Sequence, residues 1–335
     1  MEIKMKNSIV KNSQIKLFAL TLFLITFLVQ TKVVAQSLEV KNNSQLESKA
    51  DTNLNNEQTV RDRFWLFAVP ANSDYPHIKR RSVMTPAEGT CYLDIPNIIM
   101  VQAGKDNGEQ AYGKFESPLS QYMVALRPLK RVVWSVVGSA GFYSPEETRE
   151  ILKIAETSSN FYGIMLDDFF TGNKEGQRAK LSIEEFTDIH KQLKQINKNY
   201  KVLATVYNDQ LDLPLDDYFK MIDVVTFWTM NFDDLENMGS NMKKMKSVAP
   251  HAKIMLGCYF IDYGKNKGVP VPLMKKQCET GLRWIREGKI DGMIFLANTT
   301  MDIGLESVEW TRNWIKEVGD TPIPGKHSFD DHGGF

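Results

Sequence analysis

The sequence contains few cysteines and histidines, and neither basic nor acidic residues are in excess. Each of these absences excludes a class of protein. Its 335 residues include three Cys and five His, too few for a disulfide-rich scaffold and without the spacing of a zinc site. Basic and acidic residues number 41 each, so no basic field suggests a nucleic-acid partner. No motif implies a metal or a cofactor. A hydrophobic content of 42% instead fits an ordinary globular protein.

The three cysteines leave two interpretations open. Cys91, Cys258 and Cys278 could form one bridge with a leftover thiol. Alternatively, Cys258 lies inside an apolar run and is a small buried filler of the core, which is the interpretation we favour.

A long hydrophobic run is also missing. The apolar run at 17–29 has thirteen residues, whereas a spanning helix needs roughly 20. Four lysines precede it, and small residues lead to Ala35, so residues 1–35 are predicted to be a signal peptide cleaved after Ala35. A transmembrane anchor is the alternative. Cleavage removes five Lys and one Glu and leaves a net charge of −4. We therefore expect a secreted or periplasmic protein without stable membrane insertion.

The remaining chain divides into three parts by composition. Residues 36–60 are rich in Asn, Gln, Ser and charge, as a flexible leader would be. Residues 321–335 are rich in turn-forming residues, and we expect them to be a loose tail. Between them, residues 61–320 alternate apolar runs with amphipathic segments, which predicts a single folded domain.

Eight short apolar runs, rich in β-branched or aromatic residues, have the composition of strands buried on both faces. The runs cover 63–69, 97–102, 131–137, 162–167, 201–207, 223–230, 253–260 and 292–297.

Helix signals lie between these runs. Ser144 and Pro145 begin one predicted helix, and Ser182 with Glu185 forms a capping-box pattern at the start of another. Further helices are predicted at 118–129, 272–288 and 305–319, whereas the first crossover, 70–94, shows no clean helix. Eight alternations over this length indicate a (β/α)8 TIM barrel. The competing open doubly wound sheet often has a glycine-rich loop after its first strand, and none is present here.

In such a barrel the active site lies at the carboxyl ends of the strands. The run "FYGIMLDDFF" ends its strand in Asp167 and Asp168, where burial of unpaired acids would be costly. Neighbouring strand residues point opposite ways, so one acid should face the barrel mouth and its partner should come from another strand, namely Asp209, Asp233 or Asp262. Candidate catalytic residues are thus Asp167, Asp168, Asp262 and Asp233, and candidate substrate-binding residues are Tyr207, Asn208, Asp209, Trp228, Asn231, Tyr259, Tyr263 and Asn298.

Structural explanations remain open for these residues. One acid of the pair could cap a loop and the other bind a structural base. Asp233 and Asp234 could simply open the sixth helix, and Asp209 could sit in a turn. Trp65 and Trp134 lie mid-strand and are expected in the core, whereas Trp228, near its strand's end, could stack on a sugar or pack in the core. The cluster at 79–81 is either an exposed loop face or a contact for an acidic polysaccharide.

Three stretches resemble the family-18 chitinase-like glycosidases. "AKIMLGCYFIDYG" is similar to their seventh strand, "IDVVTFWTMNFDD" to their sixth, and "YGIMLDDFF" occupies the place of their acidic fourth-strand motif. The resemblance implies that fourth-strand acids are central and that sixth- and seventh-strand groups line the cleft. The chain departs from it at two points: Phe169 stands where the catalytic Glu is expected, and Met230-Asn231-Phe232 replaces a Tyr-Asp pair.

Three functions remain open from the sequence. Carboxylates with aromatic and amide neighbours suit glycoside hydrolysis, in which one acid protonates the leaving oxygen and the other attacks the sugar or activates water. A non-catalytic carbohydrate-binding barrel would keep the aromatic groove without a correctly spaced acid pair. A polysaccharide lyase would need a Tyr or Lys base beside a neutralised carboxylate. The expected partner in each case is a carbohydrate.

Overall fold

The computed structural model describes residues 58–72, 74–75, 80–102, 105–106, 109–110, 114–171 and 178–323. The predicted signal peptide, most of the predicted leader and most of the predicted tail lie outside these residues. So does Lys79 of the basic cluster. The described residues belong to one compact unit.

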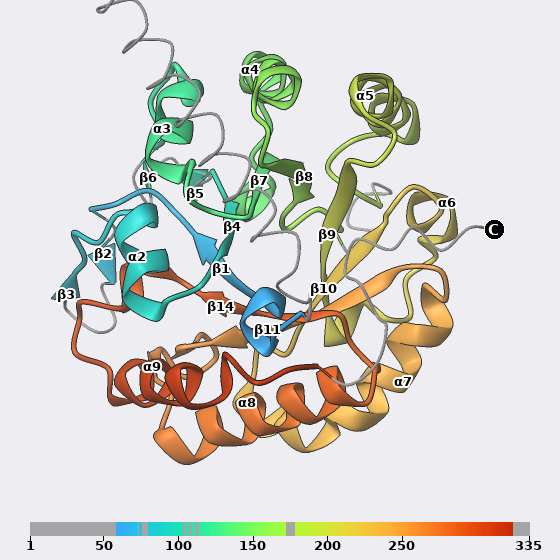
Figure 1. Cartoon of the computed structure of the whole chain (residues 1–335). Coiled ribbons are helices and arrows are strands. Elements are labelled where there is room, and N and C mark those ends of the chain that lie inside the picture. The colour runs from blue at the N-terminus through green and yellow to red at the C-terminus, as the bar shows by residue number, and fades with distance from the viewer. Residues whose placement is uncertain are drawn as a thin grey trace, which may run out of the picture. The chain divides into compact units, whose positions relative to one another are not determined.

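Eight parallel strands close into a barrel surrounded by helices (Figure 1). Each strand pairs with its neighbours in the chain, and β1 closes the ring by pairing with β14. The (β/α)8 prediction is therefore confirmed, and each of the eight predicted runs overlaps a barrel strand. The strands are β1 (Phe64–Ala68), β4 (Asn97–Met100), β7 (Arg131–Val137), β8 (Phe161–Leu166), β9 (Lys201–Tyr207), β10 (Val224–Trp228), β11 (Lys253–Tyr259) and β14 (Gly292–Leu296).

Short strands also form three hairpins outside the barrel. They pair β2 (Asp74–Tyr75) with β3 (Arg80–Arg81), β5 (Lys105–Asp106) with β6 (Glu109–Gln110), and β12 (Ile261–Asp262) with β13 (Lys267–Gly268).

The longer helices begin where the capping residues predict. Ser144 accepts a hydrogen bond from the Glu147 amide at the start of α4, and Ser182 and Glu185 complete the capping box of α5. The helices around the barrel are α2 (Pro86–Leu93), α3 (Tyr122–Leu126), α4 (Pro145–Thr157), α5 (Ile183–Ile196), α6 (Asp216–Phe219), α7 (Met238–Val248), α8 (Val271–Arg286) and α9 (Glu306–Val318). Short 3-10 turns are η1 (Val60–Arg63), η2 (Leu119–Gln121), η3 (Ser139–Gly141), η5 (Asn208–Gln210), η6 (Phe232–Asn237) and η7 (Asn298–Thr300).

Helix α2 corrects the prediction that the first crossover holds no clean helix. It has a capping box of Thr85 with Glu88 and begins with Pro86, but its apolar residues do not form a strong stripe. Tertiary packing explains its Gly89, because an added Cβ there would lie 2.7 Å from the Asn298 side chain. The helix thus depends on close approach to the end of β14.

The core fills both the barrel interior and the space between strands and helices. Trp65 and Trp134 are fully buried, as predicted for mid-strand residues. Trp134 packs outward against Met123 and Phe115, whereas Trp65 contacts Tyr162. The three cysteines are free thiols, and Cys258 is buried as the filler interpretation predicts.

The two ends of the described barrel meet. Thr59 bridges Pro322, and the Ile323 amide donates to the Gln58 carbonyl at 3.0 Å. Val60, assigned above to the leader, is fully buried. The ordered barrel therefore extends a few residues beyond the predicted borders at both ends. None of the helices in the described part of the chain has the length and apolarity that crossing a membrane requires.

Candidate functional site at the carboxyl end of the barrel

Asp167 and Asp168 follow directly after β8, at the end of the barrel where the carboxyl ends of the parallel strands meet. Asp168 has a φ of 44°, in the left-handed region that Asp tolerates better than most residues. The Asp167 amide still donates to the Val137 carbonyl at 2.8 Å, which extends the β7–β8 pairing by one residue. The backbone reverses between the two acids and gives their side chains different surroundings.

Asp167 is buried, with an exposed fraction of 4%. Thr205 donates to its Oδ1 at 2.7 Å and Ser139 donates to its Oδ2 at 3.3 Å. Burial, followed by the charge of Asp168, raises the pKa of the Asp167 carboxyl well above its ordinary value, and the two hydroxyl donors only partly oppose this. Asp167 therefore keeps its proton to a higher pH than an ordinary carboxyl group does.

Asp168 is half-buried and accepts hydrogen bonds on both oxygens. The Tyr207 hydroxyl donates to Oδ1 at 2.5 Å, and the Ala140 amide donates to Oδ2 at 2.8 Å. Asp168, like Asp167, thus uses both carboxyl oxygens as acceptors. The contact with Ala140 also matches the alternative interpretation that one acid of the pair holds a loop. Neither acid forms an ion pair with any residue that the structure describes.

Tyr207 ends β9 directly opposite Trp228 of β10. Burial raises the pKa of its phenol well above the ordinary range, with further increases from Tyr259, Asp167 and Asp168. The phenol therefore stays protonated and donates to Asp168. Tyr207 thus lies beside Asp168, and its role in binding substrate stays a prediction.

A chain of hydroxyls inside the barrel supports Asp167, and no functional role was predicted for it from the sequence. The Thr205 and Thr226 hydroxyls lie 3.3 Å apart on paired positions of β9 and β10. Trp228 donates its indole N–H to the Thr226 hydroxyl at 3.0 Å. The available signal was a threonine at an inward position in each of two otherwise apolar strands. Such a residue needs a buried partner.

Trp228 does not present an open face for sugar stacking in this structure. Its exposed fraction is 1%, and its rings pack against Phe67 and Tyr259. Gly257 permits this packing, because an added Cβ would lie 2.0 Å from the indole. The core-packing alternative is thus the one observed. Tyr259 is also buried, whereas Tyr263, which contacts it at 5.2 Å between ring centroids, is half-buried.

A second polar group lies beyond β10 and β11. The Asp262 carboxylate accepts the Lys265 amide at 3.0 Å and so closes the turn of the β12–β13 hairpin. Lys265 also forms an ion pair with Asp233 at 2.5 Å, and the Asp233 side chain is 77% exposed. Asp233 stands in the first turn of η6, as the helix-opening alternative predicts. Asn231 is exposed close by, its side-chain oxygen 2.1 Å from where a Cβ on Gly264 would lie.

Asn298 is not available to substrate, which corrects its assignment as a substrate-binding residue. The side chain is fully buried. Its oxygen accepts the Val69 amide at 2.9 Å, and its nitrogen donates to the carbonyls of Val69 and Met84 at 3.0 and 2.8 Å. The amide therefore joins the end of β14 to the end of β1. By contrast, Asp209 is exposed in η5, and Asn208 makes only a long contact of 3.5 Å with Asp234.

Phe169, at the position where the resemblance placed a catalytic Glu, is a core residue. It is fully buried and its ring contacts Phe170, Phe186 and Tyr218. Among the described residues there is also no group of three or more His, Cys, Asp or Glu side chains that could hold a metal ion.

No protein-family model and no curated protein matches the sequence. Among solved structures the chain is similar to a thermostable chitinase domain from Pyrococcus furiosus, at 15% identity and a TM-score of 0.48 over 72% of this chain and 85% of that one. A xylanase mutant from Cellvibrio japonicus matches at 11% identity and 0.44, over 71% and 87%. A tryptophan synthase α-subunit mutant from Pyrococcus furiosus matches at 10% and 0.46, over 77% and 97%. These likenesses concern the fold alone.

Proposed function

We propose that this protein is a glycoside hydrolase whose chemistry depends on the Asp167–Asp168 pair. The observation that carries the proposal is the contrast between the two neighbouring carboxyl groups. Asp167 is buried and its pKa is raised well above the ordinary value, whereas Asp168 is half-buried and is held by the Tyr207 hydroxyl and the Ala140 amide. Environments that push two titrating acids apart are typical of catalytic acid–base pairs.

Asp168 is the member of the pair that addresses the sugar, because it alone is partly exposed. Asp167, the preceding residue, has a raised pKa because of its burial and the charge of Asp168. During hydrolysis the Asp168 carboxylate attacks the sugar or activates water, and a second acid protonates the leaving oxygen. Tyr207 fixes the orientation of the Asp168 carboxylate through its hydroxyl.

The second catalytic carboxylate comes from the loops after β10 and β11. Asp233 is exposed and is held only by a surface ion pair with Lys265, an interaction of small net strength. Asp262 is buried and already used by the hairpin turn. Asp233 is therefore the better candidate. Tyr263, Asn231 and Asn208 supply an aromatic ring and two amides for binding the sugar.

The proposal includes export. Residues 1–35 would be removed as a signal peptide, and the mature protein would act on carbohydrate outside the cytoplasm. Expression of the full chain in a bacterial host, followed by N-terminal sequencing of the exported product, tests this. We expect a start at Gln36. Retention of the intact chain in the membrane would contradict it.

Single Asn substitutions test the assignment of the acids. We expect Asp168→Asn to lower kcat/KM at least a hundredfold on a panel of polysaccharides and aryl glycosides, because general acid–base catalysis contributes that much. Asp167→Asn and Asp233→Asn should also lower it strongly. Asp217→Asn is the matched control, since Asp217 is an exposed acid on α6 that pairs only with Lys220. Cleavage of any substrate with full activity in all the site variants would overturn the assignment.

A carbohydrate-binding barrel without hydrolysis is the second candidate. The contacts of Asp262 with its own turn and of Asp233 with Lys265 favour it, because each acid already has a partner. In that case an oligosaccharide binds the purified protein and is recovered uncleaved, and Tyr263→Ala weakens binding. Product formation that Asp168→Asn abolishes excludes this alternative.

A further inference from the structure

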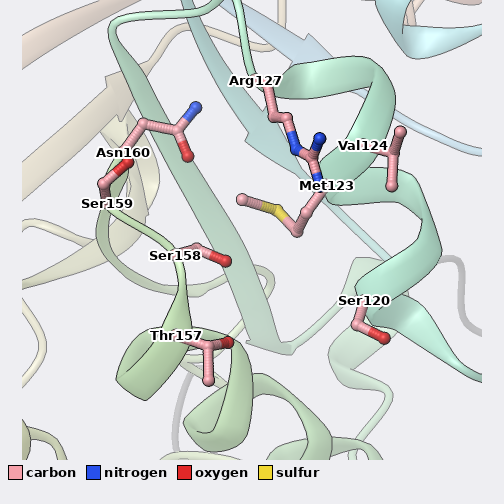
Figure 2. Close-up of a pocket in the computed structure, with 8 residues that line it drawn as sticks. All are labelled: Ser120, Met123, Val124, Arg127, Thr157, Ser158, Ser159 and Asn160. Carbon is pink, nitrogen blue, oxygen red and sulfur yellow. The ribbon is translucent and has the colours of Figure 1, made fainter. Parts of the chain in front are cut away.

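A cavity of about 430 Å³ lies between α3 and the end of α4, and the proposed hydrolase chemistry does not use it (Figure 2). Its residues precede the starts of β7 and β8, whereas Asp167 and Asp168 follow the end of β8. The cavity is therefore at the opposite end of the strands from the candidate catalytic site. The volume is in the range of sites that bind small molecules.

Most polar side chains around this cavity are exposed to solvent, namely those of Ser120, Arg127, Thr157 and Ser159. Thr157 donates its hydroxyl to the Lys153 carbonyl at 3.0 Å. Arg127 makes no hydrogen bond or ion pair with any described residue, and the side-chain hydroxyls of Ser120, Ser158 and Ser159 likewise have no partner there. Asn160 donates its amide N–H groups to the carbonyls of Leu126 and Leu129, at 2.9 and 3.0 Å. These bonds fix the Asn160 side chain and leave its oxygen as an acceptor at the cavity.

These groups come from two sides. Figure 2 shows Arg127, Met123 and Ser120 on one side and the turn holding Ser158, Ser159 and Asn160 on the other. Met123 is anchored from below by the Trp134 indole N–H at 3.3 Å and is 7% exposed, so it forms an apolar floor. The cavity thus combines a cation, hydroxyls, an amide oxygen and an apolar surface.

This combination matches one chemical class. A guanidinium with free donors binds a carboxylate in a bidentate manner. Hydroxyl and amide acceptors suit several ligand hydroxyls, and an apolar floor suits the C–H face of a ring. Helix α4 ends at Thr157, and its exposed carbonyl end disfavours an anion beside Ser158. The ligand's negative group therefore belongs at Arg127 and its hydroxyl groups at the serine turn.

We infer that this cavity is a second carbohydrate site, which binds a uronic-acid unit through Arg127 and through the Ser158–Asn160 turn. The inference does not depend on hydrolysis, because it concerns binding at the far end of the barrel. An acidic polysaccharide held there would remain attached to the protein whether or not the carboxyl-end site cleaves it.

Titration with trigalacturonate, followed by calorimetry and by backbone NMR shifts, tests the inference. We expect shifts at residues 120–127 and 157–160, and at least tenfold weaker binding in Arg127→Gln, the loss that one charge-assisted contact predicts. Arg149→Gln is the matched control, since Arg149 is an exposed arginine on α4 paired with Glu146. Arg149→Gln should bind trigalacturonate as tightly as the unaltered protein does. Asp168→Asn should show the same NMR shifts at this cavity.

Three results would overturn the inference. The first is the absence of shifts at the cavity while the barrel mouth responds. The second is equal loss of affinity in Arg127→Gln and Arg149→Gln, which would indicate a general charge effect. The third is a pair of results: equimolar inorganic phosphate displaces trigalacturonate, and neutral maltotriose binds as tightly as trigalacturonate does. Together they would show that the site does not recognise a uronic acid.

Discussion

Asp167 occupies a place where an ionised carboxylate is costly. Its surroundings are the barrel interior, two hydroxyl donors and the neighbouring acid, with no cation among the described residues around it. The protein retains a proton on this group that the unfolded chain would release above the ordinary pKa of 3.8. This single residue therefore couples the stability of the fold to pH.

The sign of that coupling gives a prediction. Between the ordinary pKa and the raised one, the folded state binds more protons than the unfolded state, so the contribution of Asp167 to stability falls as pH rises. Asn cannot ionise and keeps an oxygen for the Thr205 hydroxyl. We expect the difference in Tm, that of Asp167→Asn minus that of the unaltered protein, to increase from pH 4 to pH 8 in thermal unfolding. A constant or decreasing difference would contradict the raised pKa of Asp167.

Asn298 supports a second prediction at this scale. Asn298→Ala removes the side-chain partner of three backbone groups, two buried at Val69 and one part-buried at Met84, and we expect a loss of about 3 kcal/mol of unfolding free energy. Urea unfolding measures it. Asn208→Ala is the comparison, because Asn208 has only one long contact and should change stability by less than about 0.5 kcal/mol. Equal effects of the two substitutions would argue against a structural role for Asn298.

Elements whose signals are local could be predicted well. Each barrel strand is a run of apolar residues buried on both faces, and this pattern does not depend on its neighbours. Helix α5 carries its own capping box, so its start at Ser182 could be predicted as well. Helix α2 could not, because its packing depends on Gly89 approaching Asn298, some two hundred residues away in the sequence.

The capping box supplies the prediction for the element scale. Ser182→Ala removes the acceptor for the Glu185 amide, which lies 3.2 Å from the Ser182 hydroxyl. We expect a loss of about 1 kcal/mol in unfolding free energy by denaturant titration. Ser247→Ala is the control, since the Ser247 hydroxyl only donates back to the Lys244 carbonyl within α7. A stability change in Ser182→Ala no larger than in Ser247→Ala would show that this cap contributes little.

At the scale of the whole molecule, the barrel closes by joining its two ends. Three backbone hydrogen bonds connect residues 58–61 with residues 319–323, at 2.8–3.0 Å. They hold the entry to β1 against the segment after α9. Closure of the ring thus depends on contacts between residues far apart in the sequence.

A pair of truncations tests this closure. A chain that ends at Val318 loses all three bonds, whereas a chain that ends at Ile323 keeps them. We expect the shorter chain to be less stable by about 2–4 kcal/mol, given roughly 1 kcal/mol for each bond. Urea unfolding of the two purified chains gives the comparison. Equal midpoints would show that the ring closes without this contact.

The sequence by itself determined the eight strands, most of the long helices and the place of Asp167 and Asp168 at a strand end, because periodicity, caps and apolar runs act over a few residues. Only the tertiary structure decided which side chains meet. Burial turned Trp228 and Asn298 into structural residues, joined Thr205 and Thr226 to Asp167, and placed Asp233 on an exposed ion pair. These outcomes depend on burial and on partners from other strands, and no local pattern encodes them.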